Sequence, residues 1–254
     1  MASTDEGAPA SLKQTTVAFV LPLLAFMLVS ELAGVVRIDN PQLPWYRSAP
    51  EHWVYPLQCV LVGALLWFYQ RHYTLAPWRG LWLATWMGVL GIAIWIVPGA
   101  LYEWWSRPGV VAPEWWEWFG LVERREGFDP TIFGSDTAAY SVTVLLRFLR
   151  MVVIVPLVEE LFWRGFLMRY VQAGNRPFHT VPFGRHSWMA FWITTLAVTL
   201  VHHPEDYLAA FIWGALVYCV AVKTKSLGAC VWMHAVGNLL LGLHVMNTQM
   251  WGYW

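Results

Sequence analysis

Three groups of polar side chains interrupt apolar stretches in the second half of the chain. Their members are Glu159, Glu160 and Arg164; His202 and His203; and His234 and Asn238. A charged side chain near the centre of a bilayer costs at least about 2.5 kcal/mol, even on lenient insertion scales. Side chains this unfavourable to bury are candidates for function, and carboxylates, imidazoles and amides are the groups that activate water and stabilise developing negative charge.

Spacing within the first group gives its two carboxylates different roles. Glu160 and Arg164 are four residues apart with the acid first, which favours an ion pair along one helix face. Glu159 projects about 100° away from Glu160 and lacks that partner, so it is available as a general base. The alternative is a structural ion pair between helices. Arg147 and Arg150 precede this group, and either line a water-filled cavity or pair with acidic neighbours.

The other two groups supply imidazoles and an amide. His234 and Asn238 are four residues apart on one helix face and can donate hydrogen bonds to an oxyanion, or can link neighbouring helices. His202 and His203 precede Pro204, where a neutral imidazole can hold a water, although a solvated turn is the alternative. Together the three groups are the components of water-driven acyl cleavage.

The elements that must position these groups are membrane helices. The chain is 58% hydrophobic and 13% charged, with a mean hydropathy of +0.46, whereas an average soluble domain is about 25% charged. We therefore predict an all-α polytopic membrane bundle of about seven or eight transmembrane helices. The predicted helices are Thr15 to Val36, Trp53 to Tyr69, Gly80 to Trp104, Ala138 to Val171, Trp188 to His202, Tyr207 to Val222 and Leu227 to Met246. The fourth is longer than one crossing needs and contains Pro156, so a kink is expected there, and the length allows a partial eighth span.

Charge distribution predicts the partners and the orientation. The 16 basic and 16 acidic residues cancel, so no global field attracts nucleic acid, and the lipid bilayer is the expected surroundings. Lysine and arginine collect in alternate loops, which places those loops and the N-terminus in the cytoplasm. These residues are Lys13, Arg71, Arg79, Arg169, Arg176, Arg185, Lys223 and Lys225. We expect residues 1–254 to form one integral membrane domain with a polar N-terminal tail at 1–14.

The order of the motifs resembles a known family. Glu159-Glu160-x-x-x-Arg164, then a histidine on a following helix, then His234-x-x-x-Asn238, is similar to the CPBP family of type II CAAX prenyl endopeptidases and bacteriocin-processing or self-immunity proteins, also called ABI. The resemblance runs from about Val152 to the C-terminus and implies a catalytic core at about 138–247. The end of the chain looks most like a bacterial subgroup associated with exosortase and C-terminal sorting systems.

This resemblance implies glutamic-type intramembrane peptide hydrolysis without an obligatory metal. Glu159 would activate water with His202 as its partner, and His234 and Asn238 would form the oxyanion site. Glu160 and Arg164 would play supporting roles.

The middle motif departs from the family pattern. In the family it is usually Phe-x-x-x-His, whereas here Val198 lies four residues before His202 and Thr199 lies four before His203. Valine is the closer substitute for phenylalanine, so His202 is preferred and His203 stays open.

The resulting hypothesis is an endopeptidase of a bacterial inner membrane that cleaves a membrane-associated protein or peptide and needs no cofactor. One alternative is a zinc-dependent protease that uses the same residues as ligands, although the sequence has no His-Glu-x-x-His spacing. Another is a non-catalytic membrane partner or transporter whose buried polar groups bind a ligand or pass protons. The pattern specifies neither the substrate sequence, nor a prenyl group, nor an oligomeric state.

Overall fold

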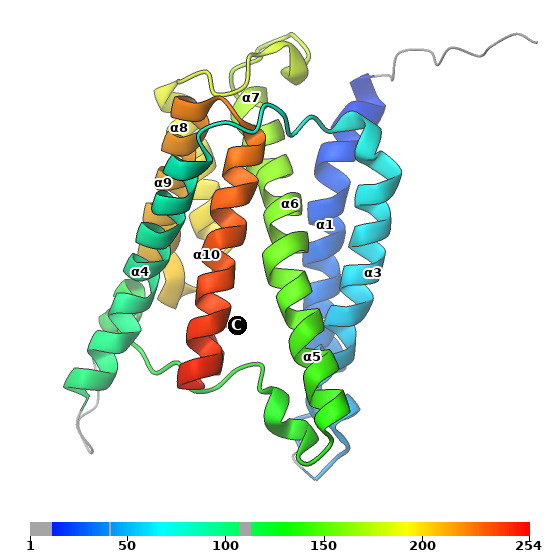
Figure 1. The fold of residues 1–254 in the computed structure, drawn as a ribbon, viewed down its shortest axis with the longest axis vertical. Helices are drawn as coiled ribbons and strands as arrows, with labels where there is room; N and C mark the ends of the chain where they lie inside the picture. Colours follow the sequence, from blue (N-terminus) through cyan, green and yellow to red (C-terminus); the bar gives the residue numbers. More distant parts are fainter. Residues whose placement is uncertain (1–11, 41, 107–112) are drawn as a thin grey trace, which may run out of the picture.

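Apolar helices account for most of the architecture. The structure, a computed structural model, describes residues 12–40, 42–106 and 113–254, and in this part of the chain it contains helices and no strand (Figure 1). Six helices are long and apolar enough to cross a membrane, and the shorter apolar helix α8 accompanies them. The all-α polytopic membrane bundle is therefore confirmed. Among the described residues, the α-helices outside the long central one are α1 (Leu12–Val36), α2 (Trp45–Ser48), α3 (Glu51–Tyr69), α4 (Leu81–Trp105), α8 (Trp188–Leu200), α9 (Tyr207–Thr224) and α10 (Leu227–Thr248).

The central helix is continuous over 34 residues from Thr137 to Tyr170, so the suggested division into two spans is wrong. It consists of α5 (Thr137–Leu149), π-helical η4 (Arg150–Ile154), α6 (Val155–Glu160), π-helical η5 (Leu161–Leu167) and α7 (Met168–Tyr170). Pro156 lies two residues after the end of the first π-helical segment, as the second residue of α6. The wider turn there accommodates a residue that lacks an N–H, and the helix continues.

Two further differences concern helix ends. Helix α8 ends at Leu200 rather than at the predicted His202, so both histidines lie in the turn that follows. Residues 1–11 of the predicted polar tail lie outside the described residues, and α1 already begins at Leu12.

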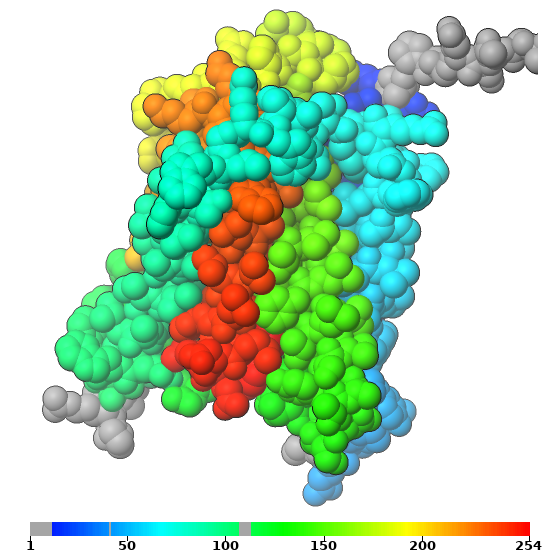
Figure 2. Space-filling model, in the orientation of Figure 1, coloured from blue at the N-terminus to red at the C-terminus, as the bar shows by residue number. Residues whose placement is uncertain are grey.

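The helices are arranged around α10. In Figure 1, α10 lies between α4 on one side and α6 on the other, while α1 and α3 form an adjacent pair and α8 and α9 another. On the face drawn in Figure 2, the red C-terminal part of the chain reaches the surface between α4 and α5. Close approach explains the tight packing of α4 on α10, since a Cβ added to Gly88 would lie 2.7 Å from the Met233 carbonyl oxygen.

The lysine- and arginine-rich loops gather at one end of the bundle, which we call the basic end. There Arg79 donates to the Thr224 carbonyl over 2.7 Å, and Arg169 donates to the Val181 carbonyl over 2.9 Å. At the other end, which we call the opposite end, Arg124 pairs with Asp206 at 2.9 Å. The described part of the 106–136 connection, the Pro204–Asp206 turn and the last residues of the chain meet there.

Candidate active site

A cavity of about 340 Å³ lies between the central helix, α4, α10 and the turn after α8. Five of the seven sequence-predicted residues line it: Glu159, His202, His203, His234 and Asn238. The other two, Glu160 and Arg164, are buried behind its wall. Helices distant in the sequence therefore bring the polar groups to one place.

Glu159 is the partly exposed acid of the pair. It is half-buried at the cavity wall and has no ion pair or hydrogen bond to another described side chain. Its charge acts on Arg150, which lines the same cavity. The two carboxylates point in different directions, as predicted, because Glu159 faces the cavity whereas Glu160 faces the protein interior.

Glu160 is fully buried and is the centre of an ionic network. Its Oε1 accepts a hydrogen bond from Arg164 Nη1 at 3.1 Å, so the predicted ion pair is present. The same oxygen lies 2.9 Å from His234 Nδ1 on α10. Arg164 also donates to the Gly214 carbonyl on α9 over 3.3 Å. Such a network compensates the buried charges and connects three helices.

The contact with Glu160 determines which ring nitrogen of His234 faces the cavity. Because Nδ1 faces the carboxylate, Nε2 is the nitrogen directed away from Glu160 and available to the cavity. The ring is also held edge-on to Trp213, with centroids 5.4 Å apart. Nε2 donates a hydrogen bond when the ring carries a proton on that nitrogen.

His202 is also fixed in orientation. Its Nδ1 lies 2.7 Å from the Val198 carbonyl oxygen, which can only accept, so Nδ1 carries the proton. Nε2 of the neutral ring is then left as an acceptor. The ring packs edge-on to Trp95 at 5.6 Å, whereas His203 is exposed. Both histidines line the cavity, and only the His202 ring is anchored in this way.

Asn238 forms a hydrogen bond between helices and also lines the cavity, where it can act as an oxyanion donor. Its Nδ2 donates to the Met151 carbonyl over 2.6 Å, and this bond links α10 to the π-helical segment η4. The interhelical bond of the structural alternative is therefore present. The amide nitrogen carries a second hydrogen, and the half-buried side chain also lines the cavity.

Aromatic side chains complete the cavity, and our sequence analysis missed them. Trp95, Trp213, Tyr253 and Trp254 all line it. Burial raises the pKa of the Tyr253 phenol to about 12, although nearby Arg124 opposes the shift, so this residue is neutral at physiological pH. Abundant aromatic residues are expected at membrane interfaces, so no sequence signal distinguished these four from the other tryptophans and tyrosines.

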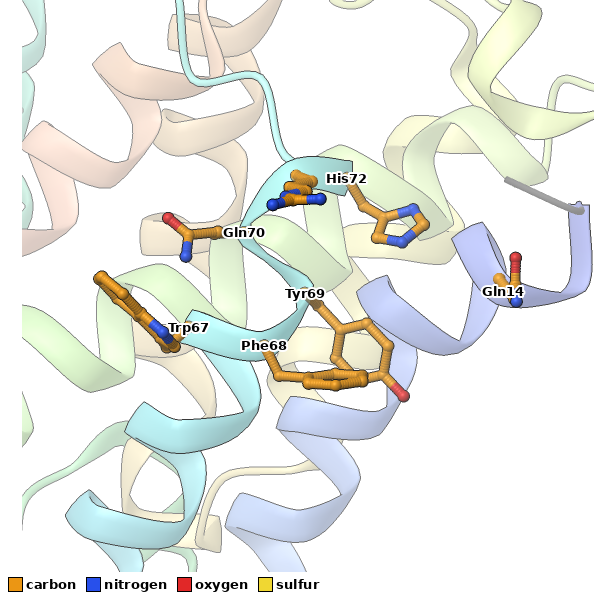
Figure 3. Close-up of a pocket in the computed structure, with 7 residues that line it drawn as sticks. Gln14, Trp67, Phe68, Tyr69, Gln70 and His72 are labelled. Carbon is orange, nitrogen blue, oxygen red and sulfur yellow. The ribbon is translucent and has the colours of Figure 1, made fainter. Parts of the chain in front are cut away.

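A second hollow is larger but lacks the required chemistry. It measures about 560 Å³ and lies near the basic end, at the end of α3. Figure 3 shows aromatic side chains such as Trp67, Phe68 and Tyr69 beside it, with Gln14 of α1 across from them. Its lining residues include no acid. The smaller cavity is therefore the candidate active site.

Histidine, cysteine and acidic side chains are the ligands that would hold a zinc ion. Within residues 12–40, 42–106 and 113–254, no three histidine, cysteine or acidic side chains lie close enough together to hold a metal ion. The zinc alternative is therefore left without an evident ligand set among the described residues.

Comparison with known proteins gives one result. The family model described as Type II CAAX prenyl endopeptidase Rce1-like matches residues 141–240, which include all seven predicted site residues. Searches of curated proteins and of solved structures gave no significant match. The family consists of proteases that act on membrane-associated substrates. The segment that carries the cavity motifs therefore belongs to the type II CAAX prenyl endopeptidase, or CPBP, family.

Proposed function

We propose that this protein is a glutamic intramembrane endopeptidase that hydrolyses a peptide bond of a membrane-associated protein with water activated by Glu159. One observation carries the proposal: an unpaired carboxylate, an anchored imidazole and two potential oxyanion donors line the same cavity. The family match over 141–240 supports peptide hydrolysis as the reaction class.

The orientation of each group gives it a role in this reaction. Glu159 removes a proton from water while the water oxygen attacks the peptide carbonyl carbon, and the acceptor Nε2 of His202 holds the other hydrogen. His234 Nε2 and the second N–H of Asn238 stabilise the oxyanion that forms. The carbon–nitrogen bond then breaks, and the proton on Glu159 passes to the leaving amine. The products are a new carboxyl group and a new amino group, and no cofactor takes part.

Chelation separates this mechanism from the zinc alternative. Protein in lipid nanodiscs would be washed with 1,10-phenanthroline and EDTA, and cleavage of C-terminal and leader peptides would then be measured by mass spectrometry. We expect kcat/KM to stay within about twofold of the untreated value, because a carboxylate base replaces the metal. A loss of activity that added Zn²⁺ restores would favour a metalloprotease instead.

We further propose that the substrate enters from the side of the membrane opposite to the basic loops. Between the cavity and the basic end lies a layer of fully buried apolar side chains, including Met168, Val217, Cys230 and Met233. Toward the opposite end, the cavity lining continues to the Pro204–Asp206 turn and the last residues of the chain. Because the positive-inside rule places the basic end in the cytoplasm, the cavity faces outward.

Cysteine labelling in intact cells tests this orientation. In a Cys219→Ser background, which removes the exposed native thiol, Glu117→Cys would mark the opposite end and Arg176→Cys the basic end. A membrane-impermeant maleimide should label Glu117→Cys directly and Arg176→Cys only after the cells are permeabilised. The reverse pattern would show that the cavity faces the cytoplasm.

A further inference from the structure

Arg147 is a buried cation whose hydrogen-bonding capacity is only partly used, by a side-chain hydrogen bond with Tyr55. Its side chain is 5% exposed, and its Nε and Nη1 atoms have no hydrogen-bond partner. Aromatic rings surround the guanidinium, with Phe128 at 4.9 Å, Tyr55 at 5.0 Å and Trp254 at 5.7 Å from its central carbon. Ring faces attract a cation but do not accept its in-plane N–H groups as carboxylates do. Leaving such donors unsatisfied is unfavourable.

Arg150 lies almost one turn further along the same helix. Its Nε donates to Gln58 Oε1 over 2.5 Å, and its guanidinium lies 4.1 Å from the Tyr55 ring centroid. Neither Arg147 nor Arg150 forms an ion pair with a carboxylate among the described residues. Both line the cavity that also contains Glu159. Two neighbouring cations in a low-dielectric wall repel each other, so this arrangement favours an anion between them.

The π-helical segment brings Arg147 close to the helix face of the proposed base. Twelve residues separate Arg147 from Glu159, which would place them about 120° apart on a regular α-helix. The π turn at Arg150–Ile154 contains about one more residue than an α-helical turn. The rotation from Arg147 to Glu159 is therefore that of about eleven α-helical residues, which leaves the two side chains about 20° apart. The rise along the axis is roughly 14 Å from Arg150 and 18 Å from Arg147. An extended peptide covers that distance in about four or five residues.

We propose that Arg147 and Arg150 bind a carboxylate of the peptide substrate and thereby set the distance from that group to the scissile bond. This inference rests on the proposed function, because it assigns part of the same cavity to substrate recognition. A guanidinium presents parallel N–H groups that match the two oxygens of a carboxylate. The carboxylate can be the C-terminus of the peptide or an acidic side chain, and both have the same chemistry.

Binding to an inactive protein tests the inference without requiring turnover. The Glu159→Gln variant in nanodiscs would be titrated with three forms of one cleavable peptide: free acid, C-terminal amide, and amide with one glutamate placed four or five residues from the scissile bond. We expect at least one carboxylate form to bind about 10- to 100-fold more tightly than the plain amide. The stronger of the two forms identifies the source of the carboxylate. Equal affinity for all three peptides would overturn the inference.

Substitution of Arg147 and Arg150 tests whether these two side chains cause the preference for a peptide with a carboxylate. Arg147→Leu and Arg150→Leu, each combined with Glu159→Gln, should bind acid and amide peptides with nearly equal affinity. Arg147→Lys retains the positive charge but not the parallel N–H groups of a guanidinium, so it should keep part of the preference for the acid peptide. Thermal melting would show that each variant is folded, and the amide peptide provides the matched baseline. Retention of the full acid preference by folded leucine variants would contradict the assignment.

Cleavage kinetics distinguish failure of this inference from failure of the proposed function. In the otherwise unmodified protein, Arg150→Leu should reduce the ratio of kcat/KM for the acid peptide to kcat/KM for the amide peptide at least about tenfold. If the parent protein cleaves no peptide yet shows the carboxylate preference in binding, the proposed function is wrong and the carboxylate site remains. If it cleaves both peptides with the same kcat/KM, the carboxylate site is wrong and the hydrolase assignment remains.

Discussion

Glu159→Gln is expected to abolish peptide cleavage, lowering kcat by about 10³-fold or more. The amide has nearly the same shape as the carboxylate but cannot take a proton from water, and general-base catalysis contributes about 10²- to 10⁴-fold. Because Glu159 is half-buried and makes no ion pair, its neutral replacement should leave the fold intact. Single-turnover cleavage followed by mass spectrometry would measure the loss, and thermal melting would check stability.

Glu205→Gln is the matched control for this experiment. Glu205 lines the same cavity, and the substitution makes the same change of charge and shape. Its backbone carbonyl, which the substitution leaves unchanged, accepts the hydrogen bond from Arg124. We therefore expect kcat within about threefold of the parent. If Glu159→Gln retains as much activity as Glu205→Gln, another group activates the water.

The sequence was sufficient to identify the polar groups because the cost of placing charge in a membrane depends on local context. Glu159, His202 and His234 stand out against apolar neighbours in any window of the chain. Hydropathy places them in or beside helices of membrane length, and their cost of burial favours a shared hydrated pocket. The ion pair between Glu160 and Arg164 could also be predicted, since it depends on spacing within a single helix.

Contacts between distant segments could not be predicted in this way. The hydrogen bond between Glu160 and His234 joins residues 74 positions apart, and no periodicity relates two separate helices. The cavity roles of Trp95 and Tyr253 were missed for the same reason. The chain has 19 tryptophans and 10 tyrosines, and most aromatic residues in a membrane protein have an interfacial or packing role.

The π-helical segments also have no hydropathy signal, yet they affect the site directly. In η4, the Met151 carbonyl accepts the Asn238 amide, and the extra residue of the turn rotates Arg147 toward the face of Glu159. Hydropathy reports which residues are apolar but not which carbonyl each N–H selects. The sequence-based prediction of a divided helix at Pro156 was wrong because the register of backbone hydrogen bonds changed while the helix continued.

Glu160→Gln is expected to reduce both stability and activity. The substitution leaves the Arg164 guanidinium, which is 2% exposed, without a compensating carboxylate. Removing one partner of a buried ion pair typically costs about 3 to 5 kcal/mol. His234 also loses the carboxylate contact that fixes its ring orientation, so we expect kcat to fall about 10²-fold or more. Thermal inactivation in nanodiscs would measure stability, and peptide cleavage at a temperature where the variant is folded would measure activity.

The double variant Glu160→Gln/Arg164→Met separates the two effects. Methionine fills much of the space of Arg164 and removes the uncompensated charge, so thermal stability should recover most of the loss. His234 still faces an amide rather than a carboxylate, so kcat should remain low. Recovery of both properties would show that Glu160 acts only as the counter-ion of Arg164. Recovery of stability alone would show that the buried acid serves catalysis by positioning His234 from behind the cavity wall.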